Sequence, residues 1–310
     1  MESLMTRQDL ARTTPWEIVV AAYLDAGVDS PNTRRAYQRH LRDAFTLMRR
    51  DTLADIRGVD LASLRAQVTD NGLSPLSQGQ ALAAMRSLLT WARGMGAHGL
   101  PSEVIGAALR MPRGKVQRPY SILSEPEIAV LLASAPTMRN RALLATMLGA
   151  GLRVSEVVGL DIQDVREDSE GGTVLHVRSG KGRRDRIVPV RPELPTCIRA
   201  YLQETGRVLD GEGPLFRSYD HGAAGRERKR LTSRAVGVVV AQCVARAGIQ
   251  AKHISPHSCR HTFALRALRH GASVVAVSKL MGHAGVNSAL AYLDHLNLGE
   301  LREAIPPLPI

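Results

Sequence analysis

Residues 110–120 interrupt the regular hydrophobic spacing of the chain and divide it into two regions. This segment combines proline, glycine and basic residues and has neither a helical nor a strand period, as is typical of a linker. A chain of 310 residues is also longer than most single domains. We therefore expect one domain at 1–109, a linker at 110–120 and a second domain at 121–310.

The first region is predicted to be a small helical bundle with basic outer surfaces. Proline at or near a first helical position marks helix starts at Thr14-Pro15 and Ser30-Pro31. In the second of these helices, a helical spacing puts apolar side chains on one face, namely Tyr37, Leu41 and Phe45. The polar face carries basic side chains, among them Arg34, Arg35 and Arg39. A further apolar helix is expected at 77–94.

The second region is predicted to be helical with one small β-sheet. Ser124 can cap its first helix, and Glu127 can complete a capping box with it. Helical patterns then alternate with a single hairpin at 173–190, where two apolar runs flank a glycine-rich turn. The fold class that we expect is therefore mainly α with a small β-sheet, built from a helical N-terminal domain and an α+β C-terminal domain.

The chain is strongly basic, with a formal net charge of +12 and a pI near 10.3. Residues 1–118 carry 16 Lys and Arg against 11 Asp and Glu, and residues 119–310 carry 25 against 18. This charge favours a polyanionic partner, and nucleic acid ahead of a membrane, because the sequence has no basic amphipathic anchor and no long apolar run. A GC-rich genome explains an Arg-rich composition equally well, so the motifs must decide.

The cysteines and the first residues predict a reduced, cytoplasmic protein. Cys197, Cys243 and Cys259 are odd in number and lack the C-x-x-C spacing of a metal or redox site. Residues 1–12 carry charges throughout and no apolar segment, so we expect no secretion signal.

Two motifs in the second domain place a cation beside glycine. In Gly151-Leu-Arg153-Val-Ser-Glu156, the glycine allows a turn after an apolar helix, and Ser155 is the expected N-cap of the next helix. Lys181 stands between two glycines at the expected tip of the hairpin, which suits a mobile proton donor. Taken singly, Arg153 and Lys181 are most often solvated cations, and Glu156 is an ordinary first-turn residue.

The run Ser255-Pro256-His257-Ser-Cys-Arg260 predicts a helix start with two cationic side chains. Ser255 is the expected N-cap and Pro256 the first helical residue, so His257 and Arg260 lie one turn apart beside free backbone N–H groups, which favour a phosphate. Two other interpretations are a structural histidine and a metal pair formed by His257 and His261. The metal interpretation lacks a third ligand in the sequence.

A tyrosine follows His283 by nine residues. From 286 onward the pattern predicts a helix, with a buried stripe of Val286, Ala289, Leu290, Leu293 and Leu296 and with Tyr292 at its flank. A tyrosine in this position is most often a core residue with its hydroxyl at the edge.

Taken together and in this order, Arg153, Lys181, His257, Arg260, His283 and Tyr292 resemble the set shared by the tyrosine recombinases, the phage integrase family. Members share an Arg in G-L-R-x-S-E, a hairpin Lys, H-x-x-R, a His or Trp after L-G, and a nucleophilic Tyr nine residues further on. The resemblance covers about 121–298 and, loosely, the helical N-terminal half. It implies a SAM-like core-binding domain at 1–109 and a catalytic domain that close around duplex DNA.

The resemblance also implies a mechanism. Tyr292 would attack the scissile phosphate to give a 3′-phosphotyrosine, Arg153 and Arg260 would hold the non-bridging oxygens, and Lys181 would protonate the leaving oxygen. His257 would take the phenolic proton, His283 would bond a phosphate oxygen, and Glu156 would orient its neighbours. No ATP, cofactor or metal is expected. The expected DNA contacts are Arg34, Arg35, Arg39, Arg113, Lys115, Arg118, Lys229 and Arg230.

The family resemblance further implies strand exchange between paired DNA sites through a Holliday junction. The expected assembly is a homotetramer on DNA, with a partner recombinase or an accessory protein as a further possible partner. About 13 residues precede the first helix, which fits the simpler Cre or Xer layout, and the protein is expected at the nucleoid. Residues 298–310 are expected to dock on a neighbouring subunit or on their own domain. A type IB topoisomerase and a catalytically silent DNA-binding protein are the alternative functions.

Overall fold

The computed structural model describes residues 13–110, 121–178, 185–218, 229–249, 253–282, 287–290 and 292–293. The chain folds into two compact units, 1–118 and 119–310. Each unit has its own hydrophobic core. In the described parts, no helix is both long and apolar enough to cross a membrane.

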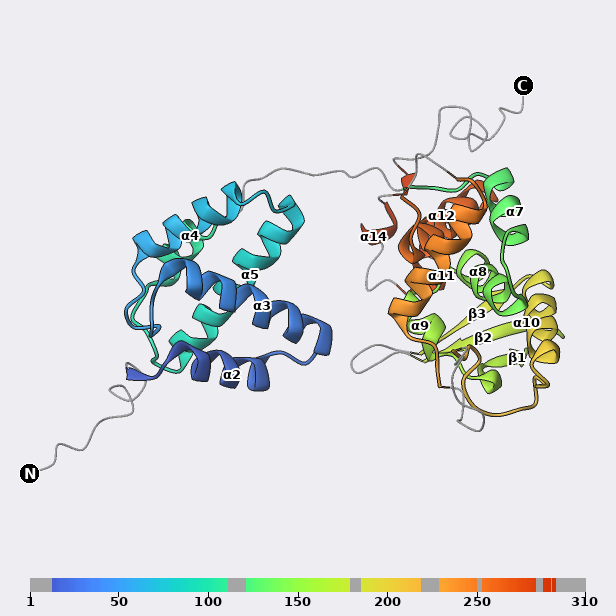
Figure 1. Cartoon of the computed structure of the whole chain (residues 1–310), viewed down its shortest axis with the longest axis horizontal. Helices are drawn as coiled ribbons and strands as arrows, with labels where there is room; N and C mark the ends of the chain where they lie inside the picture. The colour runs from blue at the N-terminus through green and yellow to red at the C-terminus, as the bar shows by residue number, and fades with distance from the viewer. Residues whose placement is uncertain are drawn as a thin grey trace, which may run out of the picture. The chain divides into compact units, whose positions relative to one another are not determined.

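In its described residues, 13–110, the N-terminal unit is built from helices and the loops between them (Figure 1). The elements are α2 (Trp16–Gly27), α3 (Pro31–Met48), α4 (Gly58–Asp70), α5 (Pro75–Gly94) and α6 (Ser102–Ala108). Helix α3 begins as the sequence predicts, with Ser30 accepting a hydrogen bond from the Thr33 N–H and Pro31 as the first helical residue. Phe45 lies in the core and stacks on Trp16, with ring centroids 4.7 Å apart.

The C-terminal unit combines helices with one three-stranded sheet (Figure 1). Its helices are α7 (Glu125–Ala133), α8 (Met138–Ala150), α9 (Val154–Gly159), the 3-10 helix η1 (Ile162–Asp164), α10 (Glu193–Glu204), α11 (Ser233–Arg246), α12 (Pro256–Arg269), α13 (Val274–Met281) and α14 (Asn287–Leu290). Helix α8 packs against both α10 and α12. It buries Leu143, Leu144, Met147 and Leu148 and so forms the middle of the core. The mainly helical fold class with a small sheet is confirmed.

The sheet has one strand more than the sequence predicts. The expected hairpin is present as β2 (Thr173–Val177) and β3 (Arg186–Val190), with Leu175 opposite Val188. A third strand, β1 (Val165–Glu167), pairs antiparallel with the other side of β2. It is only three residues long, and a strand that short carries no recognisable alternation. Expecting a single hairpin was therefore wrong.

Candidate active site

Arg153 stands at the start of α9, directly after the turn that ends α8. Gly151 makes this turn with a φ of +63°, and an added Cβ would lie 2.1 Å from a carbon of the Phe263 ring. Arg153 is itself the N-cap, and its backbone N–H donates to the Glu156 carboxylate at 2.8 Å. The expected cap at Ser155 is wrong, because Ser155 lies inside the helix and Glu156 satisfies the free N–H.

The Glu156 carboxylate joins arginines from three elements. Arg153 Nη1 donates to Oε1 at 2.9 Å, and Arg186 donates to Oε1 and Oε2 at 3.0 and 2.8 Å. Arg260 Nη1 lies 3.9 Å from Oε2. Burial alone would raise the pKa of Glu156, but the hydrogen bonds from Arg186 and Arg153 outweigh it and lower this pKa to about 2. The carboxylate is therefore ionised at neutral pH.

Arg260 is a buried cation that is held by backbone oxygens. Its side chain is 3% exposed, and it donates to the carbonyl of Gly151 at 2.7 Å and to the carbonyl of Met281 at 2.6 Å. Burial, followed by repulsion from Arg153, lowers the pKa of Arg260 to about 10. The guanidinium thus remains charged at neutral pH, and its plane is fixed by two distant segments.

The same segment of backbone also holds the other two arginines. Arg153 Nη2 donates to the Gly282 carbonyl at 2.9 Å, and Arg186 Nε donates to the Leu280 carbonyl at 2.8 Å. Carbonyl oxygens orient a guanidinium without neutralising it, so three cations share the single carboxylate of Glu156. A cluster with this excess of positive charge and with preorganised N–H donors suits an anion such as a phosphodiester.

Helix α12 brings two histidines and the tyrosine together. The helix starts as predicted, with Ser255 as N-cap and Pro256 as first residue. His257 lies at the surface with part of its ring against the protein, and this partial burial, then Arg260 and Arg153, lower the pKa of His257. The His257 and His261 rings meet edge to face, with centroids 4.1 Å apart.

Tyr292 contacts His261 directly. Its hydroxyl oxygen lies 2.8 Å from His261 Nδ1, and the two residues are 3% and 5% exposed. The ring of His257, the predicted acceptor of the phenolic proton, contacts the His261 ring, which in turn contacts Tyr292. In the described parts of the chain, no group of three or more His, Cys, Asp or Glu side chains is placed to hold a metal ion.

The apolar stripe around Tyr292 differs from its prediction. Ala289 and Tyr292 are buried, with Ala264, Val277 and Met281 in the same cluster. Leu290 and Leu293, expected in the stripe, are 45% and 36% exposed. Adjacent helical positions point about 100° apart, so Ala289 faces this cluster and Leu290 does not. Val286 and Leu296 lie outside the described residues.

Several predicted site residues fall outside the described ranges. They are Lys181 and His283, most of the linker with Arg113, Lys115 and Arg118, and the tail 298–310. Their predicted roles stay predictions.

The remaining expected DNA contacts differ in what holds them. Arg34 donates to the Leu24 carbonyl at 3.0 and 2.7 Å and pairs with Asp25, so its guanidinium ties α3 to α2. Arg35 donates to Asn32 Oδ1 at 2.6 Å. Arg39 and Lys229 are exposed. Arg39 and Lys229 are therefore more accessible to a DNA backbone than Arg34 is.

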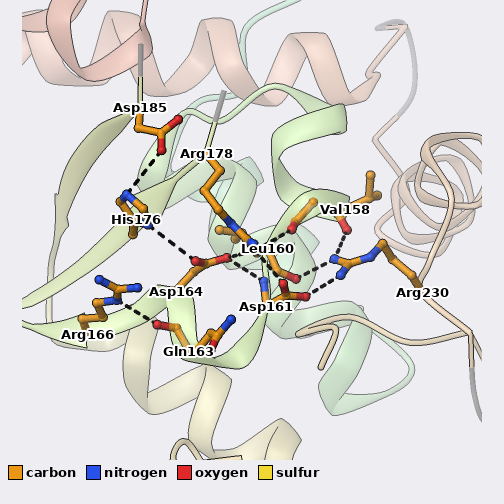
Figure 2. Close-up of polar contacts among 11 residues, drawn as sticks. Val158, Leu160, Asp161, Gln163, Asp164, Arg166, His176, Arg178, Asp185 and Arg230 are labelled. Atoms are coloured by element: carbon orange, nitrogen blue, oxygen red, sulfur yellow. Dashed lines mark hydrogen bonds and ion pairs between the residues drawn. The ribbon is translucent and has the colours of Figure 1, made fainter. Parts of the chain in front are cut away.

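Arg230 belongs to a second charged network, which Figure 2 shows. It donates to the Val158 and Leu160 carbonyls at 2.8 and 3.0 Å and pairs with Asp161. Asp161 and Asp164 also accept from Arg178, which follows β2, both at 2.6 Å. Burial would raise the pKa of Asp161, but Arg178 and Arg230 outweigh it and lower this pKa. Arg230 therefore anchors the chain to the segment from α9 to η1, and its predicted DNA contact stays a prediction.

Two residues at the site were not assigned a role there from the sequence. Arg186 alternates with Val188 and Val190, so it lies on the inward face of β3, and a charged residue at an inward position is a signal that the sequence does contain. His261 is one helical turn after His257, and only the metal alternative considered it. Nothing in the sequence indicated its contact with Tyr292, which is 31 residues away.

Comparisons with known proteins agree with this arrangement. The model of the phage integrase family matches residues 121–298, and that of the phage integrase N-terminal SAM-like domain matches residues 22–96. Tyrosine recombinase XerC of Pelobacter propionicus is 34% identical over 285 residues, which cover 88% of each chain. Tyrosine recombinase XerD of Neisseria meningitidis is 31% identical over 274 residues, which cover 87% of this chain and 89% of that protein.

Solved structures show the same fold. A lambda integrase dimer bound to a COC′ core site superposes with a TM-score of 0.69 at 18% identity, covering 90% of this chain and 95% of that chain. With a catalytic-domain match over more than half of the chain and relatives above 30% identity along most of it, the chain belongs to the phage integrase family of tyrosine recombinases, site-specific enzymes that act on DNA.

Proposed function

We propose that Tyr292 is the nucleophile of this recombinase and that the arginine cluster around Glu156 binds the scissile phosphate. The observation that carries the proposal is the convergence of Arg153 and Arg260 on one carboxylate, with Tyr292 against the helix that bears Arg260. Attack by the phenolic oxygen forms the Tyr–O–P bond and breaks the bond to the 5′-oxygen. The product is a 3′-phosphotyrosine with a free 5′-hydroxyl.

The arginines act where charge accumulates. The phosphorane carries one more negative charge than the phosphodiester, and Arg153 and Arg260 donate to its non-bridging oxygens from positions that backbone carbonyls have already fixed. Loss of one such preorganised donor costs about 2.7–4 kcal/mol in comparable oxyanion sites. His257 takes the phenolic proton, Lys181 donates a proton to the 5′-oxygen, His283 bonds a phosphate oxygen, and Glu156 orients the arginines.

The finer assignment of domains and partners rests on the family. Residues 1–109 form the core-binding domain, 110–120 the linker and 121–310 the catalytic domain, and both domains contact duplex DNA. Among the predicted contacts that the structure describes, Arg39 and Lys229 are exposed and so accessible to a phosphate. Two strand exchanges through a Holliday junction take place in a homotetramer at the nucleoid, in which residues 298–310 dock on the neighbouring subunit.

A covalent adduct tests the nucleophile. The target duplex is first selected with the wild-type chain from random-sequence DNA, and it is then nicked so that the 5′-hydroxyl fragment is lost after cleavage. The wild-type chain should give an adduct that survives denaturing electrophoresis, and Tyr292→Phe should give none. If Tyr292→Phe still forms the adduct, another residue is the nucleophile.

Exchange between two sites tests the reaction that follows. Two labelled copies of the selected duplex should yield recombinant products and branched intermediates. Deletion of residues 298–310 should leave binding to a single site intact and lose assembly on two sites. Assembly that survives the deletion would overturn the proposed docking in trans.

A further inference from the structure

Arg186 is a third arginine of the site, and it connects three segments that are far apart in sequence. It is the first residue of β3, it forms a bidentate pair with Glu156 at the start of α9, and its Nε donates to the Leu280 carbonyl near the end of α13. Arg153 also donates to the Glu156 carboxylate, and it donates to the carbonyl of Gly282, two residues after Leu280. Arg186 and Arg153 thus brace the same carboxylate and the same stretch of backbone.

The structure indicates that Arg186 does not itself bind the phosphate. Its side chain is 11% exposed, and three of its five N–H donors already have protein acceptors. Gly282 covers the guanidinium so closely that an added Cβ would lie 2.7 Å from Nη1. A side chain enclosed in this way can act on the reaction only through the groups that it holds.

We infer that Arg186 is a positioning residue that fixes Glu156 and the 280–282 backbone, and through both of them the guanidinium of Arg153. This inference rests on the proposed role of Arg153 at the phosphate. Without Arg186, the Glu156 carboxylate is free to rotate about its side-chain bonds, and Arg153 loses a rigid acceptor. A displacement of about 1 Å at a catalytic group can cost on the order of 100-fold in rate.

A second route of action is open to a residue on β3. Lys181 precedes Arg186 by five residues, so a change at Arg186 could disturb the leaving-group proton donor instead of the phosphate ligand. The contacts favour the first route, because the hydrogen bonds of Arg186 to described residues go to Glu156 and Leu280. The two routes predict different responses to chemically altered phosphates.

The experiment measures single-turnover cleavage of the selected duplex in three forms. The first has the ordinary phosphodiester. The second has a methylphosphonate, which lacks one charged non-bridging oxygen and so depends less on the arginines. The third has a bridging sulfur in place of the 5′-oxygen, which leaves without a proton donor. The variants are Arg186→Gln and Arg186→Lys, with Arg207→Gln as a control for the loss of a structural arginine, because Arg207 donates to Tyr201 and to the Pro214 carbonyl elsewhere in the domain.

Arg186→Gln is expected to cleave the phosphodiester about 100-fold more slowly than wild type, with DNA affinity changed less than about 3-fold. The defect should shrink to below about 10-fold on the methylphosphonate and persist on the sulfur substrate. Arg186→Lys should behave like Arg186→Gln, because a lysine keeps the charge but cannot make the bidentate pair. The ratio between substrates is taken within one protein, so a lower folded fraction cancels from that ratio.

Three results would overturn the inference. A defect that is equal on all three substrates, or matched by Arg207→Gln, would mean that Arg186 only stabilises the fold. Rescue by the sulfur substrate alone would mean that it acts through the leaving group. Wild-type rates in Arg186→Gln would remove any role in cleavage. Failure of the wild-type chain to form the Tyr292 adduct would instead overturn the proposed function, so the two failures are distinguishable.

Discussion

The hydroxyl of Tyr292 lies 2.8 Å from Nδ1 of His261, and both residues are buried among the side chains of α12, α13 and α14. By the family resemblance, the proton of this tyrosine goes to His257. His257 lies on α12, one turn before His261, and is at the surface. Two histidines with different environments therefore lie near Tyr292, the proposed nucleophile. Their separate contributions can be measured.

Replacement of each histidine by phenylalanine should lower the free energy of unfolding at His261 but not at His257. His261→Phe should lower the free energy of unfolding by about 1–3 kcal/mol, because it removes the hydrogen bond to a buried hydroxyl. His257→Phe should change it by less than about 0.5 kcal/mol, because that ring lies at the surface. Urea unfolding at pH 7 measures both. Equal losses would contradict the difference in burial as the cause.

Glu156→Gln should destabilise the protein at neutral pH. The variant leaves three guanidinium groups without their carboxylate, and removal of one member of a buried ion pair costs about 3–5 kcal/mol. The mutant should also form adduct more slowly, because Arg153 loses an acceptor. Urea unfolding and the adduct assay provide the measurements, and Glu167→Gln on the exposed face of β1 is the control.

The same substitution should change the acid response. The pKa of Glu156 is about 2 in the folded protein, against an ordinary value of 4.5 for the unfolded chain. The ionised carboxylate therefore adds stability above pH 4.5, and this contribution disappears as the pH falls toward 2. The difference corresponds to roughly 3 kcal/mol. Unfolding curves between pH 7 and pH 3 should therefore converge for wild type and Glu156→Gln. Parallel curves would show that another group dominates.

Alanine at two left-handed glycines should have different costs. Gly151→Ala combines the strain of a φ of +63° with a Cβ 2.1 Å from the Phe263 ring, so we expect a loss of about 2–5 kcal/mol. Gly171 has a φ of +79°, but an added Cβ meets nothing within 4 Å, so Gly171→Ala should cost only about 1–2 kcal/mol. Thermal unfolding compares them. Gly151→Ala should also lower cleavage, since its carbonyl holds Arg260.

Asp161→Asn should loosen the network of Figure 2. Asp161 accepts from both Arg178 and Arg230, so its neutralisation should cost about 1–3 kcal/mol in stability. Asp185→Asn removes a half-exposed carboxylate 3.7 Å from His176 and should cost less than about 1 kcal/mol. Urea unfolding at low and high salt provides the test. A larger loss in Asp185→Asn would show that the network is not centred on Asp161.

Much of this fold was predictable because the decisive signals are local. Ser255 and Pro256 start α12 as expected, and the Ser124–Glu127 capping box starts α7, because each signal lies within three residues of sequence. The glycine-rich turn between two apolar runs likewise predicted β2 and β3.

The parts that were not predicted depend on contacts across the fold. Arg153 and not Ser155 is the N-cap of α9, and the Glu156 carboxylate that completes this cap also accepts from Arg186, which is 30 residues away. Tyr292 is buried against side chains of α12 and α13, and no helical periodicity can indicate these contacts. The order of motifs identified the proposed catalytic residues, but their mutual support became visible only in three dimensions.

The carbonyls that hold Arg260 have a further consequence for work with the DNA-free enzyme. These carbonyls orient a buried guanidinium but do not neutralise its positive charge. Without a bound anion, this charge lowers the stability of the folded protein, and a small oxyanion that binds beside it should restore that stability. Sulfate or orthophosphate in a buffer should thus raise the melting temperature and compete with DNA, as expected for ligands that bind only the folded state. Activity measured in chloride and in sulfate at equal ionic strength should differ for this reason.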